Sequence, residues 1–178
     1  KKLHAVKQTD PVLREHVLRR LADSFFFLGE MRGKQDYFSA VDYYKQILND
    51  YPDPRPGNDL VYERLSKCNW NLKFYYEAVQ SLERLSMRYP DSQYVPDALF
   101  RSAEILSLLG KFKEAIDKSQ VYVNKYPEGA HAKKATFIIS DCYYRLSQPE
   151  NAETWYAQAQ KKWSDLSDLP KYIIIDFG

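Results

Sequence analysis

The sequence predicts an all-α protein built of stacked helix–turn–helix repeats. Three features recur together every 37 or 38 residues: an alanine, a bulky residue three positions before it, and a tyrosine–proline pair ending twelve positions after it. The alanines are Ala40, Ala78, Ala115 and Ala152. The bulky residues are Tyr37, Tyr75, Phe112 and Pro149, and the closing prolines of the first three periods are Pro52, Pro90 and Pro127. Self-similarity at such a period is typical of a stacked array of repeats.

Each period encodes two helices and the turn between them. A second small residue precedes each alanine, by eighteen positions in the first period and by twelve in the others; these are Ala22, Ser66, Ala103 and Ser140. Small residues in both helices let the two backbones cross closely, and the bulky residue wedges the turn. Proline ends the second helix because it has no N–H for the helical ladder. We therefore expect repeats at about residues 11–52, 58–90, 95–127 and 131–164.

The ends of the chain and two insertions depart from this period. Residues 170–178 are predicted to begin a further repeat, with a capping helix as the alternative, and Leu3 and Val6 are predicted to end a preceding helix. The chain is thus expected to be a fragment of a larger array. Residues 31–36 are predicted as a loop inside the first repeat, and residues 53–58 as a longer link to the second. Either insertion suits a binding loop or a tolerated surface loop.

This pattern of small crossing residues, aromatic, alanine and closing proline resembles the tetratricopeptide repeat family over nearly the whole chain. The resemblance implies that residues 1–178 form one right-handed superhelical solenoid of about four repeats plus the start of a fifth. It also implies a concave groove lined by the first helix of each repeat. Asn69 and Ser102 stand at positions where the family prefers apolar residues, and the fourth repeat has Pro149 and Ser164 in place of the wedge aromatic and the closing proline.

Composition and motifs favour a protein without enzymatic activity, metal site or cofactor. The 178 residues are 44% hydrophobic, which is enough to form a repeat core. A net charge of +2 does not indicate a strongly charged partner. The sequence has no Gly-rich phosphate loop, no Cys-x-x-Cys and no His-Glu-x-x-His. No apolar run approaches the ~20 residues that span a bilayer. Cys68 and Cys142 are expected to stay unpaired, because stacked helices ~8–10 Å apart would place them beyond disulfide reach.

The first helices supply the candidate binding residues. Positions that share one helical face across the repeats mix aromatic rings with charges of both signs, which suits an amphipathic peptide or helix. The predicted groove residues are Arg19, Asp23, Phe26, Lys67, Trp70, Asn71, Phe100, Glu104, Phe137, Asp141, Tyr144 and Arg145. Alternatively, rings such as Phe26 and Phe100 pack between repeats, and Trp70 with Tyr144 and Arg145 is the better functional candidate. The acidic members of this face would repel the C-terminal carboxylate that some family members clamp.

The linkers between repeats provide the sequence evidence about function and cellular location. Residues 89–98, Tyr-Pro-Asp-Ser-Gln-Tyr-Val-Pro-Asp-Ala, and residues 126–130, Tyr-Pro-Glu-Gly-Ala, resemble a repeat subclass common in bacterial envelope proteins. Examples are the outer-membrane assembly lipoprotein and the TolA-binding coordinator. The resemblance implies a periplasmic or envelope-associated scaffold for protein–protein interaction, with other proteins as partners and possible self-association through the C-terminal repeat edge. The alternatives are a cytoplasmic adaptor or regulatory module and, less favoured, a single-strand RNA-binding array. RNA binding needs a basic groove, and this one carries at least as many acids as bases.

Overall fold

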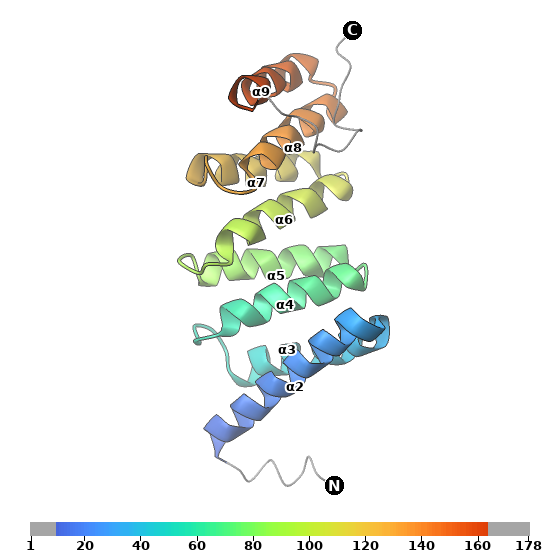
Figure 1. Ribbon diagram of the computed structural model, residues 1–178, viewed down its shortest axis with the longest axis vertical. Coiled ribbons are helices and arrows are strands. Elements are labelled where there is room, and N and C mark those ends of the chain that lie inside the picture. The colour runs from blue at the N-terminus through green and yellow to red at the C-terminus, as the bar shows by residue number, and fades with distance from the viewer. Residues whose placement is uncertain (1–9, 164–178) are drawn as a thin grey trace. The chain divides into compact units, whose positions relative to one another are not determined.

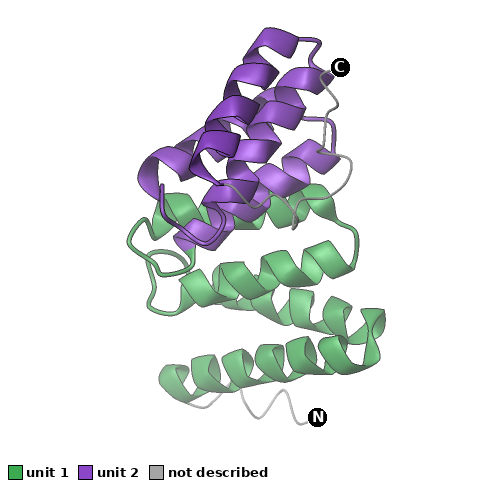
Figure 2. Ribbon diagram, turned by 45° about the horizontal axis from the view of Figure 1, so that its top comes forward, with its two compact units in different colours: residues 1–94 green, residues 95–178 purple. Residues whose placement is uncertain are grey.

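The described residues, 10–163 of a computed structural model, fold into eight helices and no strand (Figure 1). The helices are α2 (Pro11–Arg32), α3 (Lys34–Asp50), α4 (Asn58–Asn71), α5 (Tyr75–Arg88), α6 (Val95–Leu108), α7 (Phe112–Lys125), α8 (Ala132–Arg145) and α9 (Pro149–Lys162). The chain divides into two compact units, residues 1–94 and 95–178 (Figure 2). The predicted helix ends at Leu3 and Val6 and the predicted fifth repeat at residues 170–178 lie outside the described residues. The all-α prediction is confirmed.

Each unit contains two helical hairpins joined in series. Unit 1 pairs α2 with α3 and α4 with α5, and α3 also packs against α4. Unit 2 pairs α6 with α7 and α8 with α9, while α8 contacts both α6 and α7. None of the described helices is long and apolar enough to cross a membrane.

The small residues lie where the paired helices cross, as the sequence predicts. Ala22, Ala40, Ala78, Ala103, Ala115, Ser140 and Ala152 have no exposed surface, and Ser66 is 3% exposed. In unit 2 the crossing is close enough for a direct bond, because the Ser140 hydroxyl donates to the Ala152 carbonyl at 2.8 Å. That bond also satisfies a hydroxyl that would be costly to bury alone.

The tyrosine–proline pairs end the second helices. α3, α5 and α7 stop one residue before Tyr51, Tyr89 and Tyr126, whose N–H groups donate the last bonds of the helical ladder. The proline that follows each tyrosine cannot continue the ladder. In the fourth repeat, Pro149 stands in the first turn of α9, where no intrahelical partner exists for an N–H. Proline in place of the aromatic residue therefore removes no hydrogen bond from the helix.

The prediction that residues 31–36 form a loop is wrong. α2 continues to Arg32 and α3 begins at Lys34, so only Gly33 separates them. Gly33 has φ +100°, a conformation that favours glycine, and it reverses the chain in one residue. The inserted Met, Arg, Lys and Gln are all good helix formers, so the insertion lengthens the two helices. The second insertion is confirmed as a link, since α4 begins only at Asn58.

A polar cluster holds that link in place. The Asp53 carboxylate accepts hydrogen bonds from the hydroxyls of Tyr62 and Tyr89, each at 2.5 Å, and from the Asn58 amide at 3.0 Å. Burial alone would raise the pKa of Asp53, but these three bonds together outweigh it and lower that pKa. The link is therefore tied to α4 and to the end of α5.

Glu15 ties the same link to α2. Its carboxylate pairs with Arg55 in the link and with Arg19 one turn along α2, at 2.8 Å. The hydrogen bond from Arg55 is the largest influence on the pKa of Glu15 and lowers it, against a smaller effect of burial. The Arg19 guanidinium also donates a hydrogen bond to the side-chain oxygen of Asn58 at 2.7 Å. One connected set of polar contacts thus joins α2, the link and α4.

Both cysteines are buried and unpaired, Cys68 in unit 1 and Cys142 in unit 2. Burial raises the pKa of the Cys68 thiol to about 12 and that of the Cys142 thiol to about 11. Both therefore remain protonated thiols near neutral pH, which makes them poor nucleophiles.

The helix crossings can be tested by enlarging them. Ala78→Leu and Ala115→Leu add methylenes where no space exists, and we expect each to lower the free energy of unfolding by about 1–3 kcal/mol or more. Leucine at Lys113 or Lys161, both exposed, should change it little. Urea unfolding followed by circular dichroism measures all four variants. Equal losses at buried and exposed sites would contradict the repeat register.

The polar cluster makes stability depend on pH. The folded-state pKa values of Glu15 and Asp53 lie below their ordinary values of 4.5 and 3.8. Their contribution is therefore complete above the unfolded-state pKa values and is lost as the pH falls through the lower folded-state values. Glu15→Gln should cost about 1–3 kcal/mol at neutral pH and flatten the decline in acid. Urea unfolding of both proteins over a series of pH values from neutral to strongly acidic checks this, and parallel declines would contradict it.

Candidate functional site

The first-helix face of unit 1 is formed by α2 and α4, which are in contact. Arg64 of α4 joins them: its guanidinium pairs with Asp23 and lies 5.6 Å from the Phe26 ring centre and 5.3 Å from that of Phe27. Asp23 also accepts a hydrogen bond from the Tyr44 hydroxyl at 2.9 Å. The predicted groove residue Asp23 is therefore held between helices rather than offered freely to a partner.

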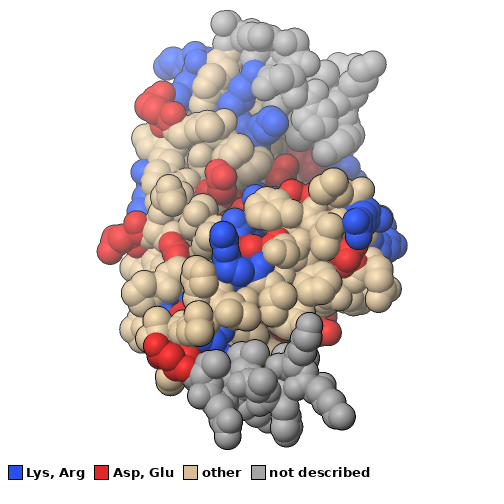
Figure 3. All heavy atoms as spheres, turned by 60° about the horizontal axis from the view of Figure 1, so that its bottom comes forward, with Lys and Arg blue, Asp and Glu red and all other residues tan. Residues whose placement is uncertain are grey.

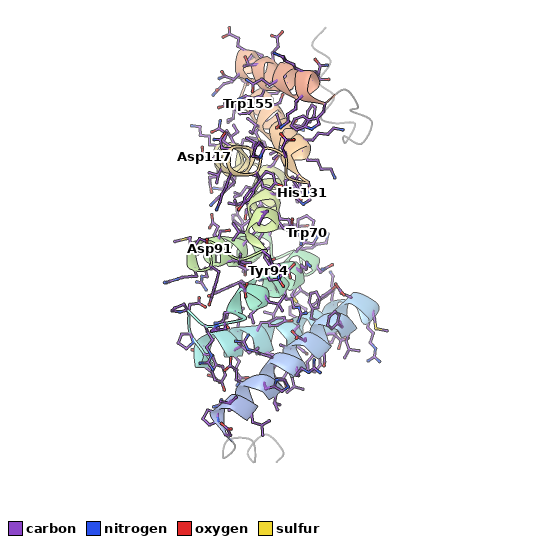
Figure 4. The ribbon with its side chains drawn as sticks, turned by 60° about the vertical axis from the view of Figure 1, so that its left-hand side comes forward. Trp70, Asp91, Tyr94, Asp117, His131 and Trp155 are labelled. Atoms are coloured by element: carbon purple, nitrogen blue, oxygen red, sulfur yellow. The ribbon has the colours of Figure 1, made fainter. Side chains whose placement is uncertain are left out.

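The exposed rings on this face are Phe27, at 50% exposure, and Trp70, at 37%. The Trp70 ring packs against the Tyr75 ring, and the two ring centres are 5.1 Å apart. Figure 4 shows Trp70 in the ribbon with the other side chains as sticks. An aromatic ring that is both supported and exposed can insert into a partner at small entropic cost.

The polar candidates beside Trp70 are only locally engaged. Lys67 pairs with Glu63 one turn away at 2.5 Å, and the Asn71 amide donates to the Lys67 carbonyl at 2.9 Å. Both are pairs within one helix, which are weak and easily exchanged for contacts with another chain. Arg19 differs, because its guanidinium is engaged by Glu15, Asn58 and the Gly57 carbonyl. The structure thus assigns Arg19 to the link cluster.

Three predicted anchors lie in the core instead of the groove. Phe26 and Phe100 are each 4% exposed, and Phe137 is fully buried. Phe26 packs edge-on against Tyr37 at 6.4 Å, Phe137 packs edge-on against Tyr156 at 5.6 Å, and Phe100 stacks on the His131 ring at 4.2 Å. The expectation that these rings face a partner is corrected in favour of the packing alternative.

Helix length explains which rings are covered. Positions three or four residues from the crossing residue lie within one turn of the packed face. α2 continues for six residues beyond Phe26, so α3 covers that ring. Trp70 and Tyr144 stand in the last turns of α4 and α8 and are 37% and 49% exposed. The exposed rings of α4 and α8 therefore lie at the helix ends, whereas Phe27 is exposed within α2.

In unit 2 the exposed candidates gather at the end of α8. Tyr144 is 49% exposed, and Arg145 beside it is also exposed. The Arg145 Nε lies 3.5 Å from an oxygen of Asp141, which is only 7% exposed. Burial raises the pKa of Asp141, while the neighbouring Arg145 opposes that rise. Asp141 thus positions Arg145 more than it contacts solvent.

Glu104 of α6 is the remaining acidic candidate in unit 2. Its side chain reaches the surface, yet desolvation by the surrounding groups raises the pKa of Glu104, against the opposing charges of Arg101, Lys134 and His131. On the face shown in Figure 3, basic and acidic side chains lie close together rather than in separate fields. Such mixed charge favours selection of register in a partner over attraction of one charge sign.

The described residues contain no group of three or more His, Cys, Asp or Glu side chains arranged to hold a metal ion. Sequence reasoning missed Arg64 as the residue that organises the unit 1 face. The available signal was the pair Phe26–Phe27 beside an acidic residue, Asp23, since a guanidinium stacks on rings and pairs with carboxylates.

These features define a helical-repeat protein with an exposed ring at the end of two of its first helices, α4 and α8. The tetratricopeptide repeat family model matches two parts of the chain, residues 17–54 and 97–129. Those matches cover the first and third of the predicted repeats. The search of curated proteins gives no match.

Solved structures with the same fold include proteins named MamA. One, described as MamA 41-end from Desulfovibrio magneticus RS-1, is 15% identical, with a TM-score of 0.58 and 89% of each chain covered. MamA of AMB-1 is 21% identical, with a TM-score of 0.60 over 90% of this chain and 84% of that one. A double mutant of MamA from RS-1 is 16% identical, with a TM-score of 0.62 over 83% and 74%. At these identities the likeness shows the fold, an all-helical array of the tetratricopeptide type.

The division between core and exposed rings is testable. Phe137→Ala should lower the free energy of unfolding by about 3–5 kcal/mol, because it opens a cavity in a closed core. Tyr144→Ala, seven residues along the same helix, should lower it by much less. Thermal unfolding monitored by circular dichroism compares the two. If Phe137→Ala proves as mild as Tyr144→Ala, the ring is not part of the core.

Proposed function

We propose that this chain is a protein–protein interaction scaffold that binds a peptide or helix of a partner along its first-helix faces. The observation that carries the proposal is an exposed ring in the last turn of a first helix in each unit, Trp70 in unit 1 and Tyr144 in unit 2. Each ring is followed by a polar residue, Asn71 or Arg145, at the helix end. The matches to tetratricopeptide repeats support the proposal.

The chemistry of these positions suits a partner with alternating apolar and charged residues. A tryptophan or tyrosine ring buries a large area while immobilising few torsions, and such rings dominate the energetics of many interfaces. Lys67 and Glu63 in unit 1 and Arg145 with Asp141 in unit 2 supply both signs of charge beside the rings. A uniformly charged partner would meet repulsion from one member of each pair.

We place this scaffold in a bacterial cell-envelope assembly, in the periplasm or associated with the envelope. Support comes from the linkers at residues 89–98 and 126–130, which resemble the envelope subclass of these repeats. The alternative is a cytoplasmic adaptor with the same binding face. Fractionation of cells that produce the full-length gene product with an epitope tag distinguishes the two compartments.

The binding face can be tested by cross-linking followed by measured affinities. A photoreactive residue placed at Trp70 or at Tyr144 should cross-link a partner segment in cells, which mass spectrometry identifies. Against that purified segment, Trp70→Ala and Tyr144→Ala should each raise Kd at least about tenfold. Arg145→Glu should weaken binding most at low salt, since part of its effect is electrostatic steering.

The control is Lys113→Ala, which removes an exposed side chain on α7 and should leave Kd unchanged. Circular dichroism must show that all variants remain helical. If Trp70→Ala and Tyr144→Ala stay folded and bind as tightly as the parent protein, the partner uses other surfaces and the proposed face is wrong.

A further inference from the structure

A cleft of about 400 Å³ lies in unit 1 between the second helices of the two repeats. Its floor is α4, which contributes Tyr62, Leu65 and Asn69, and its walls are α3 and α5. The volume is within the range of small-molecule sites and corresponds to roughly a dozen water molecules in the liquid. The groove residues Lys67, Trp70 and Asn71 do not line it.

One repeat position places an amide on the floor of the cleft. Three residues after the crossing residue, the four repeats have Phe25, Asn69, Leu106 and Tyr143. Phe25 stacks on Tyr43 of the next helix, with ring centres 5.4 Å apart, and Leu106 is 4% exposed. Asn69 is the only polar aliphatic residue of the four. Its side chain makes the floor between α3 and α5 polar.

The Asn69 amide faces this cleft without a partner. Asn69 is 2% exposed and lines the floor, yet its side chain forms no hydrogen bond with any described residue. Among the described residues the side-chain polar atoms that are both fully buried and unbonded belong to Arg64 and Ser119, so the Asn69 amide reaches the surface of the cleft, where an occupant can bond to it. Within the described residues, the cleft thus offers a carbonyl acceptor and an amide donor to an occupant.

The charges around the cleft favour an anion. Lys45 of α3 and Arg84 of α5 lie on its rim, and neither forms an ion pair with a described residue. Glu77 is the one acidic residue of the lining, so the site carries a net charge of about +1 at neutral pH. The Tyr62 hydroxyl is already committed to Asp53 at 2.5 Å. The lining therefore matches a ligand with one net negative charge better than a dianion.

We propose that this cleft binds a small organic carboxylate. The planar fork of Arg84 matches a carboxylate group in geometry and charge, and Lys45 adds a second cation across the cleft. The Asn69 amide hydrogen-bonds a polar group at the inner end of the ligand, while Leu48 and Leu65 contact its carbon skeleton. Glu77 disfavours the higher charge of phosphate. The site is separate from the proposed partner-binding face and does not depend on it.

Nuclear magnetic resonance of nitrogen-15-labelled protein tests this directly, because the Asn69 side-chain amide gives its own signal. Butyrate, lactate and L-glutamate, each with one net negative charge at neutral pH, are added in turn at millimolar concentration, with inorganic phosphate and ethylenediamine as the competing chemistries. We expect at least one of the three carboxylates to shift the Asn69 signal in a saturable manner. Arg84→Gln should weaken that binding at least about tenfold, since it removes a charge-assisted bond.

Asn69→Leu replaces the amide by an apolar group of similar size, so it should weaken binding, measured by the shifts of backbone amides around the cleft, at unchanged or higher melting temperature. Asn124→Leu and Lys113→Gln, both at exposed positions of α7, are the matched controls and should leave binding intact. Three results overturn the proposal: no carboxylate shifts the Asn69 signal, phosphate or ethylenediamine shifts it as strongly, or Arg84→Gln binds unchanged. Because Arg84 is exposed, its variant remains informative even if Asn69→Leu fails to fold.

Discussion

The close crossing of paired helices at small residues is the constraint on which both units depend. In unit 2 the approach at Ser140 and Ala152 brings a side-chain hydroxyl within 2.8 Å of the facing backbone carbonyl. No larger side chain fits such a contact, because protein cores are packed at near-crystalline density. With the crossing fixed, the residues one turn away along the same helix must lie on the packed face. The repeat period, the core and the exposed face all follow from that register.

The link between the two repeats of unit 1 shows how an irregular segment is held within a regular array. It contributes Asp53 and Arg55, whose charges are compensated by hydroxyls from α4 and the end of α5 and by Glu15 of α2. Each contact crosses from the link to a different helix. A segment of this kind needs few apolar contacts, because its polar groups are satisfied by the surfaces it joins.

Sequence reasoning predicted the features set by local stereochemistry. The close helix crossings depend on small side chains, and the helix ends at Tyr51, Tyr89 and Tyr126 depend on the proline that follows each tyrosine. Both properties can be read directly from the sequence. The insertion at residues 31–36 was misread, because helix-forming residues around one glycine are compatible both with a loop and with two longer helices. Whether Phe137 or Tyr144 faces solvent depends on how far the neighbouring helix extends, and a periodic pattern does not contain that length. Of the candidate site, the sequence indicated the helices and the rings at their ends but not the role of Arg64.

One helix, α4, shows how a single register serves two surfaces. Asn69 and Trp70 are adjacent, and their side chains point about 100° apart around the helix axis. Asn69 therefore faces the cleft between the second helices, while Trp70 lies on the first-helix face at the helix end. The repeat constrains size strictly at the crossing residue Ser66 and more loosely at these two positions. The amide of Asn69 makes the cleft floor polar, and the partly exposed ring of Trp70 lies on the first-helix face, so one helix contributes to both candidate surfaces.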